Sequence, residues 1–158
     1  MIDKIGVKTT IRELVAYKAL KPGESEVVEV ARLNKELYEK GARPRDPTMV
    51  LFYDPKEEPE CRREVLIPVD REVEGVATKM MPELKVAFLV FIGTSRPVES
   101  YYEELYRYIE ERGLRPASGM CSIEAVYQPA EYGLSYGSLI DEDAPEHWST
   151  EIMIPVEG

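Results

Sequence analysis

The sequence has few of the residue types that build metal centres and disulfide frameworks. Among its 158 residues there are only two cysteines, one histidine and one tryptophan. Cys61 and Cys121 lie far apart and outside any C-x-x-C motif, and one histidine with two separated cysteines cannot make a structural zinc site. We therefore expect no metal and no cofactor, and a reduced protein of the cytoplasm.

Positive charge and long apolar runs are also scarce. Lys and Arg total 20 against 30 Asp and Glu, which gives a formal net charge of −10. No basic run is long enough to grip phosphates, so we expect no DNA binding by this chain itself and no binding to an anionic membrane surface. The longest mainly apolar run, Val86–Ile92, is far shorter than the roughly 20 residues of a membrane helix, and the N-terminus has no signal-peptide pattern.

What the sequence does contain is an internal repeat. The segment GARP at residues 41–44 resembles GLRP at residues 113–116, an offset of 72 (113 − 41 = 72), and at this offset Leu20 meets Ile92 with no gap. Further on, REVLIPV at residues 63–69 matches TEIMIPV at residues 150–156, an offset of 87 (150 − 63 = 87). We interpret residues 1–158 as a single domain in which 5–70 and 82–157 are two copies of one unit.

Each copy is predicted to run strand, helix, strand, strand. In the first copy a strand over 7–20 precedes a helix that Ser25 caps and Gly41 ends, followed by strands over 49–53 and 64–69. In the second copy the strands are 84–92, 122–127 and 150–156, and Gly113 ends the helix. Residues 70–82 form a polar connector. Two apolar stripes at helical spacing mark the buried faces: Val27, Val30, Leu33 and Leu37, and Val98, Tyr101, Leu105 and Ile109.

These elements predict an α+β fold. Two copies of about 75 residues cannot each bury a covered sheet well, so we expect one mainly antiparallel sheet with both helices on one face. A ligand groove is then expected at the pseudo-twofold seam between the copies. Strand alternation places the aliphatic residues of 65–69 and 152–156 under the helices, which turns Glu64 and Glu151 toward the open face.

Glu124 is the most informative charged residue. Ile123 and Ala125 resemble a helix-covered face, which would turn Glu124 to the open face among apolar neighbours. A carboxylate in such a place is costly unless it meets a partner or a cation. The alternative is a solvated glutamate, or one paired with Lys or Arg.

Together these patterns resemble the GyrI-like family, the effector-binding domain of AraC- and MerR-type multidrug regulators, which is related in fold to SOUL haem-binding proteins. The resemblance rests on the repeated unit, the two Ile-Pro-Val strand endings, the Tyr53-Asp54-Pro55 turn, the Glu124 strand and the closing segment 150–156. It covers residues 5 to 157. No DNA-binding segment precedes it, so the chain resembles a stand-alone member.

The resemblance implies a buried acid and an aromatic residue from a Glu-x-Tyr in the fifth core strand. Glu124 fills the acid position, but Val126 stands where the tyrosine belongs and Tyr127 comes one residue later. An alternative register would put Ala125 at the acid position and leave the site without its acid. The family's aromatic residue near the second strand–helix junction is also absent, since residues 93–95 are Gly-Thr-Ser.

The leading hypothesis is a small-molecule binding protein that takes lipophilic cationic or aromatic ligands. A desolvated carboxylate attracts a cation at low dielectric, and aromatic faces add cation–π contacts. The candidate ligand-binding residues are Glu124, Glu151, Tyr53, Tyr127, Trp148 and Tyr17. No catalytic residue is assigned, but some relatives are hydrolases of electrophilic small molecules, and for that alternative Glu124 would act as the general acid or base.

Three further ideas rest on residues between 128 and 147. The family's name comes from gyrase inhibition, and the acidic run 141–143 is the feature that favours such a protein partner. His147 is the only histidine that could ligate haem. Residues 133–137 match the letters of a Gly-x-Ser-x-Gly elbow but lack the following helix that this motif needs, so we interpret residues 132–136 as a flap over the groove.

Overall fold

The computed structural model describes residues 2–93, 96–127 and 148–158. Its first half contains β1 (Ile2–Thr9), β2 (Glu13–Leu20), α1 (Glu26–Glu39), β3 (Thr48–Phe52) and β4 (Arg63–Pro68). Its second half contains β5 (Thr78–Met81), β6 (Lys85–Ile92), α2 (Val98–Glu111), β7 (Arg115–Pro116), β8 (Ser122–Tyr127) and β9 (Ser149–Glu157). No helix in this described part of the chain is long and apolar enough to cross a membrane.

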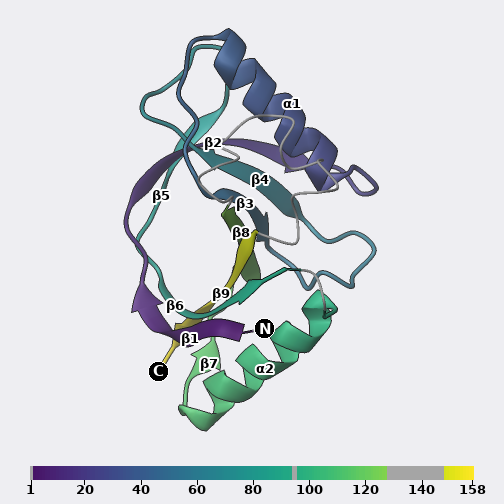
Figure 1. Cartoon of the computed structure of the whole chain (residues 1–158), viewed down its shortest axis with the longest axis vertical. Coiled ribbons are helices and arrows are strands. Elements are labelled where there is room, and N and C mark those ends of the chain that lie inside the picture. The colour runs from purple at the N-terminus through teal and green to yellow at the C-terminus, as the bar shows by residue number, and fades with distance from the viewer. Residues whose placement is uncertain (1, 94–95, 128–147) are drawn as a thin grey trace.

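The strands form one antiparallel sheet in the order β1-β6-β9-β8-β3-β4-β2-β5, with β7 paired to β9. Figure 1 shows that this sheet is strongly curved and that α1 covers one half while α2 covers the other. The order is symmetric about the central pair β8–β3. The predicted α+β fold, with a duplicated unit and both helices on one side of an antiparallel sheet, is confirmed.

The helices form for the reasons read from the sequence. The Ser25 side chain accepts a hydrogen bond from the Val28 backbone N–H at 3.3 Å, which caps α1. Leu33 and Leu37 of α1 are buried against Val65 and Ile67 of β4, and α2 packs in the same way on Ile152 and Ile154 of β9. Val27, which the sequence placed on the buried stripe of α1, is instead 43% exposed.

The face of the sheet opposite the helices is mostly filled. Its apolar residues come from both halves and pack into one cluster: Val15, Met49, Leu51, Leu66, Met81, Val86, Phe88, Ile123, Ala125 and Met153. Curvature brings strands from the two ends of the sheet around this cluster, which we call the interior. Most of the groove expected on this face is therefore packed core, and what remains of it is a cavity of about 350 Å³ lined by residues of both halves, among them Met49 and Met153.

Two predicted element boundaries are wrong, and for the same reason. The segment 7–20 is not one strand, because β1 pairs with β6 whereas β2 pairs with β4 and β5. The connector 70–82 holds β5, which pairs with β2. Each half thus begins with a strand that joins the edge of the other half, a long-range pairing that local patterns do not encode.

The repeat also has a shift that the sequence comparison missed. The helices match at an offset of 72, from Glu26–Glu39 to Val98–Glu111. In the sheet, however, Tyr17 lies opposite Leu66 and Phe88 lies opposite Met153. Because residues 66 and 153 are related by the offset of 87, the matching offset of β2 and β6 is 71 (88 − 17 = 71). Leu20 therefore corresponds to Phe91 rather than to Ile92, and both pack under helices.

Candidate ligand-binding cleft

A cleft of about 530 Å³ lies on the helix side of the sheet, beside the first turns of α2. The loop that follows β3 forms one wall, and the residues just before and at the start of β8 complete it. Its lining is Pro55, Lys56, Glu57, Val98, Glu99, Tyr102, Glu103, Tyr106, Cys121 and Ser122. The volume lies within the range of about 300–1,000 Å³ that is usual for small-molecule sites.

Glu124 faces this cleft side of the sheet. In β8 it lies opposite Val50 of β3 and Ile152 of β9, whose side chains pack toward the helices. Ile123 and Ala125 point the other way, into the interior. The predicted orientation of Glu124 toward the face opposite the helices is therefore wrong. Both faces of the sheet are apolar and covered, so the apolar pattern of β8 did not reveal which face was which.

Three side chains surround the Glu124 carboxylate. The Tyr102 hydroxyl donates a hydrogen bond to Glu124 Oε2 at 2.6 Å, and the Lys56 ammonium lies 2.6 Å from the same oxygen. Tyr102 Oη and Ser122 Oγ are 3.0 Å apart. Since the single Tyr102 proton goes to the carboxylate, the Ser122 hydroxyl donates to Tyr102. We call Lys56, Tyr102, Ser122 and Glu124 the cleft cluster.

Burial fixes the protonation state of the tyrosines in the cleft. Desolvation, together with the charge of Glu124 and its hydrogen bond, raises the pKa of Tyr102 well above its usual value. Desolvation and Cys121 raise the pKa of Tyr106 to about 12. Both phenols are therefore neutral hydrogen-bond donors at neutral pH. The Glu124 side chain is 17% exposed and stands behind the lining of the cleft, where it contacts the lining residues Lys56 and Tyr102.

Aromatic faces lie beside the charges of the cleft cluster. The Lys56 ammonium is 5.1 Å from the centre of the Phe52 ring and 5.5 Å from that of Tyr102. The Tyr102 and Tyr106 rings are 6.5 Å apart and tilted by 30°. Two π faces and a carboxylate around one point are the elements of a cation site.

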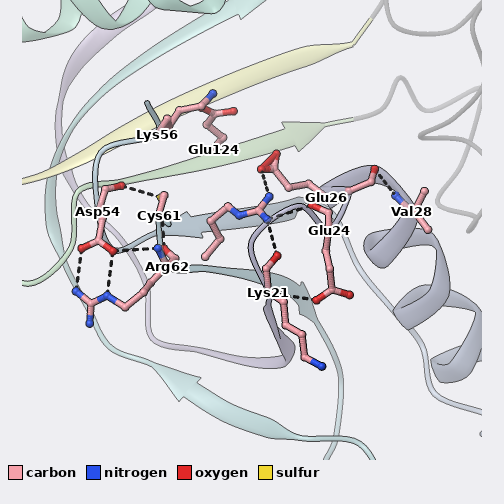
Figure 2. Close-up of polar contacts among 11 residues, drawn as sticks. Lys21, Glu24, Glu26, Val28, Asp54, Lys56, Cys61, Arg62 and Glu124 are labelled. Atoms are coloured by element: carbon pink, nitrogen blue, oxygen red, sulfur yellow. Dashed lines mark hydrogen bonds and ion pairs between the residues drawn. The ribbon is translucent and has the colours of Figure 1, made fainter. Parts of the chain in front are cut away.

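The loop that presents Lys56 is anchored at its base (Figure 2). The Asp54 carboxylate accepts three hydrogen bonds from Arg62, from its backbone N–H at 2.9 Å, from Nε at 3.0 Å and from Nη2 at 2.9 Å. These bonds lower the pKa of Asp54 to about 2. The Cys61 thiol also donates to the Asp54 carbonyl oxygen, at 3.2 Å. Lys56 is thus held by a closed turn rather than by a long free loop.

Four of the other predicted binding residues lie in the interior, in two groups. In the first interior cluster, Glu64 accepts a hydrogen bond from the Tyr53 hydroxyl at 2.9 Å and pairs with Lys79, whose ammonium lies 4.3 Å from the centre of the Tyr17 ring. Burial, with the hydrogen bond to Glu64, raises the pKa of Tyr53. Tyr53 and Tyr17 thus come together, but on the face opposite Glu124.

The second interior cluster repeats the first. Glu151 accepts a hydrogen bond from the Tyr127 hydroxyl at 3.2 Å and pairs with Lys8 at 2.5 Å, and the Lys8 ammonium lies 4.7 Å from the centre of the Phe88 ring. Desolvation raises the pKa of Tyr127 strongly. Lys8, Tyr127 and Glu151 also line a smaller cavity, of about 350 Å³, together with Met49, Met81 and Met153.

Trp148 joins neither interior cluster. Its side chain is 7% exposed, its indole Nε1 is buried with no hydrogen-bond partner in the described part of the chain, and its carbonyl oxygen accepts from the Gly93 N–H at 3.1 Å. The predicted site residues therefore separate into Glu124 on the helix side, four residues in the interior, and Trp148 apart. His147, the acidic run 141–143, the elbow-like segment and the flap over 132–136 lie outside the described residues.

Sequence reasoning missed Tyr102 and Lys56. A signal for Tyr102 was present, because Tyr102 and Tyr106 are four residues apart and form a second aromatic stripe beside the buried one that contains Tyr101. Lys56 carried no signal, since a lysine in a charged loop is ordinarily solvated. Within residues 2–93, 96–127 and 148–158, no group of three or more His, Cys, Asp or Glu side chains is arranged to hold a metal ion.

The fold defines the chain as an α+β domain built on one curved antiparallel sheet. The family of GyrI-like small molecule binding domains matches residues 17–157, and the chain belongs to this family. The resemblance inferred from the sequence is thereby confirmed. No curated protein matches the sequence significantly.

Several solved structures share the fold. The crystal structure of the EcmrR C-terminal domain has a TM-score of 0.74 at 15% identity, covering 98% of this chain and 97% of that one. SAV2435 bound to tetraphenylphosphonium has a TM-score of 0.56 at 14% identity, covering 98% and 94%. A hydrolase from Listeria innocua has a TM-score of 0.60 at 10% identity, covering 98% and 92%. The chain spans 57% of EcmrR as seen in a DNA complex.

Proposed function

We propose that this protein binds lipophilic aromatic cations in the cleft beside α2, with Glu124 as the acid that attracts them. The observation that carries the proposal is the position of the Glu124 carboxylate, 2.6 Å from the Tyr102 hydroxyl and behind a lining that contains two tyrosine rings. Further carboxylates at Glu57, Glu99 and Glu103 line the cleft against one lysine, so the surrounding potential also favours a cation.

The size and chemistry of the cleft support the same class of ligand. An aromatic cation places its rings against Tyr102 and Tyr106 and its charge near Glu124, where partial desolvation strengthens the attraction. SAV2435, which has this fold, is described as bound to tetraphenylphosphonium, a cation of this class. We extend that ligand class to this protein as part of the proposal, together with its predicted cytoplasmic location.

Titration calorimetry with tetraphenylphosphonium tests the proposal. We expect saturable binding to the wild type and at least a tenfold weaker affinity for Glu124→Gln, which keeps the shape of the side chain but removes its charge. Glu64→Gln is the matched control, because it makes the same change in the interior, and it is expected to bind as the wild type does. Equal binding by Glu124→Gln and the wild type would refute the role of Glu124.

One observation favours a second candidate, hydrolysis of an electrophilic small molecule. The tyrosine that was missing at position 126 is supplied from α2 by Tyr102, in direct contact with the Glu124 carboxylate. In that reaction Glu124 would take a proton from water while the Tyr102 hydroxyl orients the substrate. Mass spectrometry of epoxides incubated with the wild type and with Glu124→Gln distinguishes the candidates, since binding alone leaves the substrate unchanged.

A further inference from the structure

The place proposed for the charge of the ligand is occupied by the ammonium group of Lys56. The Lys56 ammonium lies 2.6 Å from Glu124 Oε2 and within 5.1 and 5.5 Å of the centres of the Phe52 and Tyr102 rings. A carboxylate and two aromatic faces are the contacts that the proposed ligand's charge would make. A ligand cation and Lys56 cannot both occupy this point, because two like charges at contact distance repel.

We propose that Lys56 is an internal competitor that determines which ligands the cleft accepts. This inference rests on the proposed function and adds a selection rule to it. A ligand cation must first displace the Lys56 ammonium from Glu124. A small hydrophilic cation makes the same charge contact as the lysine that it replaces, so the exchange gains no binding free energy. A ligand gains only when its apolar surface also covers the tyrosine faces of the cleft. Lys56 therefore selects for bulky lipophilic cations and against inorganic or simple amine cations.

The position of Lys56 makes this displacement feasible. Its side chain is 30% exposed, so the ammonium can move into water without being left buried and unpaired. The anchoring of the loop by Asp54 and Arg62 keeps the lysine close to the cleft after it leaves Glu124. The high local concentration of a tethered competitor means that the lysine returns when the ligand departs.

The interior clusters offer a contrast that supports this assignment. Lys8 and Lys79 also pair with a glutamate and lie over an aromatic ring, but both are carried by strands of the sheet, where the backbone is fixed by pairing with β6 and β2. Lys56 is carried by a loop and lines the larger cleft. Lys8 lines the smaller cavity instead, and Lys79 lines neither.

The test compares Lys56→Gln with the wild type, using tetraphenylphosphonium and the neutral triphenylphosphine oxide as probes. We expect Lys56→Gln to bind tetraphenylphosphonium about tenfold more tightly and the neutral probe with a much smaller gain. Lys79→Gln is the matched control and should leave both affinities unchanged. Lys56→Met, which keeps the apolar stem, replaces Lys56→Gln if the latter is poorly folded.

The outcomes separate this proposal from the proposed function. If the wild type binds the cation and both Lys56 variants bind it no better, the competitor role is overturned while the cleft remains a binding site. If no variant binds either probe, the proposed function fails and this inference fails with it. Binding by the Lys56 variants alone supports both, since it shows a site that the lysine normally fills.

A second measurement reports displacement directly. Reductive methylation with ¹³C labels each lysine amine, and the Lys56 signal, assigned with Lys56→Gln, should move toward the position of a solvated lysine as tetraphenylphosphonium is added. The signals of Lys8 and Lys79 should stay in place. A Lys56 signal that does not move at saturating ligand contradicts the proposal.

Discussion

The interior and the cleft both hold a lysine, a glutamate and a tyrosine in contact, yet the two regions differ in one respect. The interior cluster is present in each half, because Glu64 and Glu151 occupy equivalent positions in β4 and β9. The cleft cluster has no such twin. Tyr53 and Tyr127 show that β3 and β8 match at an offset of 74 (127 − 53 = 74), so the counterpart of Glu124 is Val50.

The helices show the same asymmetry. At the helix offset of 72, the counterpart of Tyr102 is Val30, which is buried in the core under α1. One half thus closes the helix–sheet contact with two valines, whereas the other half puts a tyrosine and a glutamate there. The interior clusters occur in both halves and are therefore explained by the fold. The pair Tyr102 and Glu124 occurs in one half, at positions where the other half packs Val30 and Val50, so the fold does not require it and a function is the better explanation. This comparison favours the cleft over the interior as the ligand site.

The largest effect is expected in the interior. Glu151→Ala removes a carboxylate that is 3% exposed in its side chain and leaves Lys8 and Tyr127 without their partner, so unfolding free energy should fall by about 2–3 kcal/mol. Glu64→Ala should cost less, about 1–2 kcal/mol, because that carboxylate is 13% exposed. Urea denaturation measures both. If neither change alters stability, the repeated clusters are not structural.

Glu124→Val places a valine in β8, as the first half has at the equivalent position, Val50 of β3. We expect the free energy of unfolding to stay within about 1 kcal/mol of the wild type, because the Lys56 side chain is 30% exposed and can turn to water, and the Tyr102 hydroxyl keeps Ser122 as a hydrogen-bond partner. Tetraphenylphosphonium binding should nevertheless weaken at least tenfold. Urea denaturation measures the stability of the variant, and calorimetry on the same sample measures its affinity for the cation. A large loss of stability would mean that Glu124 serves the fold as Glu151 does.

Tyr106 links the cleft to stability at high pH. Its pKa in the folded protein is about 12 against roughly 10 in an unfolded chain, so its contribution to stability is complete below pH 10 and is lost as the pH rises toward 12. Tyr106 is 40% exposed, and solvent screening therefore limits the effect to under about 1 kcal/mol. Urea denaturation at pH 9 to 12 should show a shallower loss of stability for Tyr106→Phe than for the wild type. Parallel slopes would contradict the raised pKa.

The smallest effect concerns the turn that carries Lys56. The pKa of Asp54 is lowered to about 2 by Arg62, so its stabilising contribution is present above the unfolded value of about 3.9 and is lost as the pH falls through 2. Asp54→Asn should lower the urea midpoint slightly at pH 7, and the difference from the wild type should vanish near pH 2. The same variant should bind tetraphenylphosphonium slightly more tightly, since a looser turn holds Lys56 less well.

The sequence predicted the elements that depend on local periodicity. The stripes ending at Leu37 and Ile109 mark one face of each helix, and the alternation of Ile152 and Ile154 marks one face of β9; the structure buries all four as expected. The repeat predicted that the two halves share one mainly antiparallel sheet, which the structure confirms. The exchange of β1 and β5 between the halves could not be predicted in this way, because it joins segments far apart in the chain.

The candidate site was predictable only in part. The chain itself determined that Glu124 and Ile123 point to opposite faces, because alternation along a strand is a property of the backbone. The tertiary structure decided that Glu124 is the residue that points toward the helices, because β8 pairs with β3 and β9 so that Glu124 lies beside Val50 and Ile152. Tertiary structure alone also brought Lys56 and Tyr102 to the carboxylate, since a contact between a loop, a helix and a strand depends on how the sheet curves and not on any spacing in the sequence.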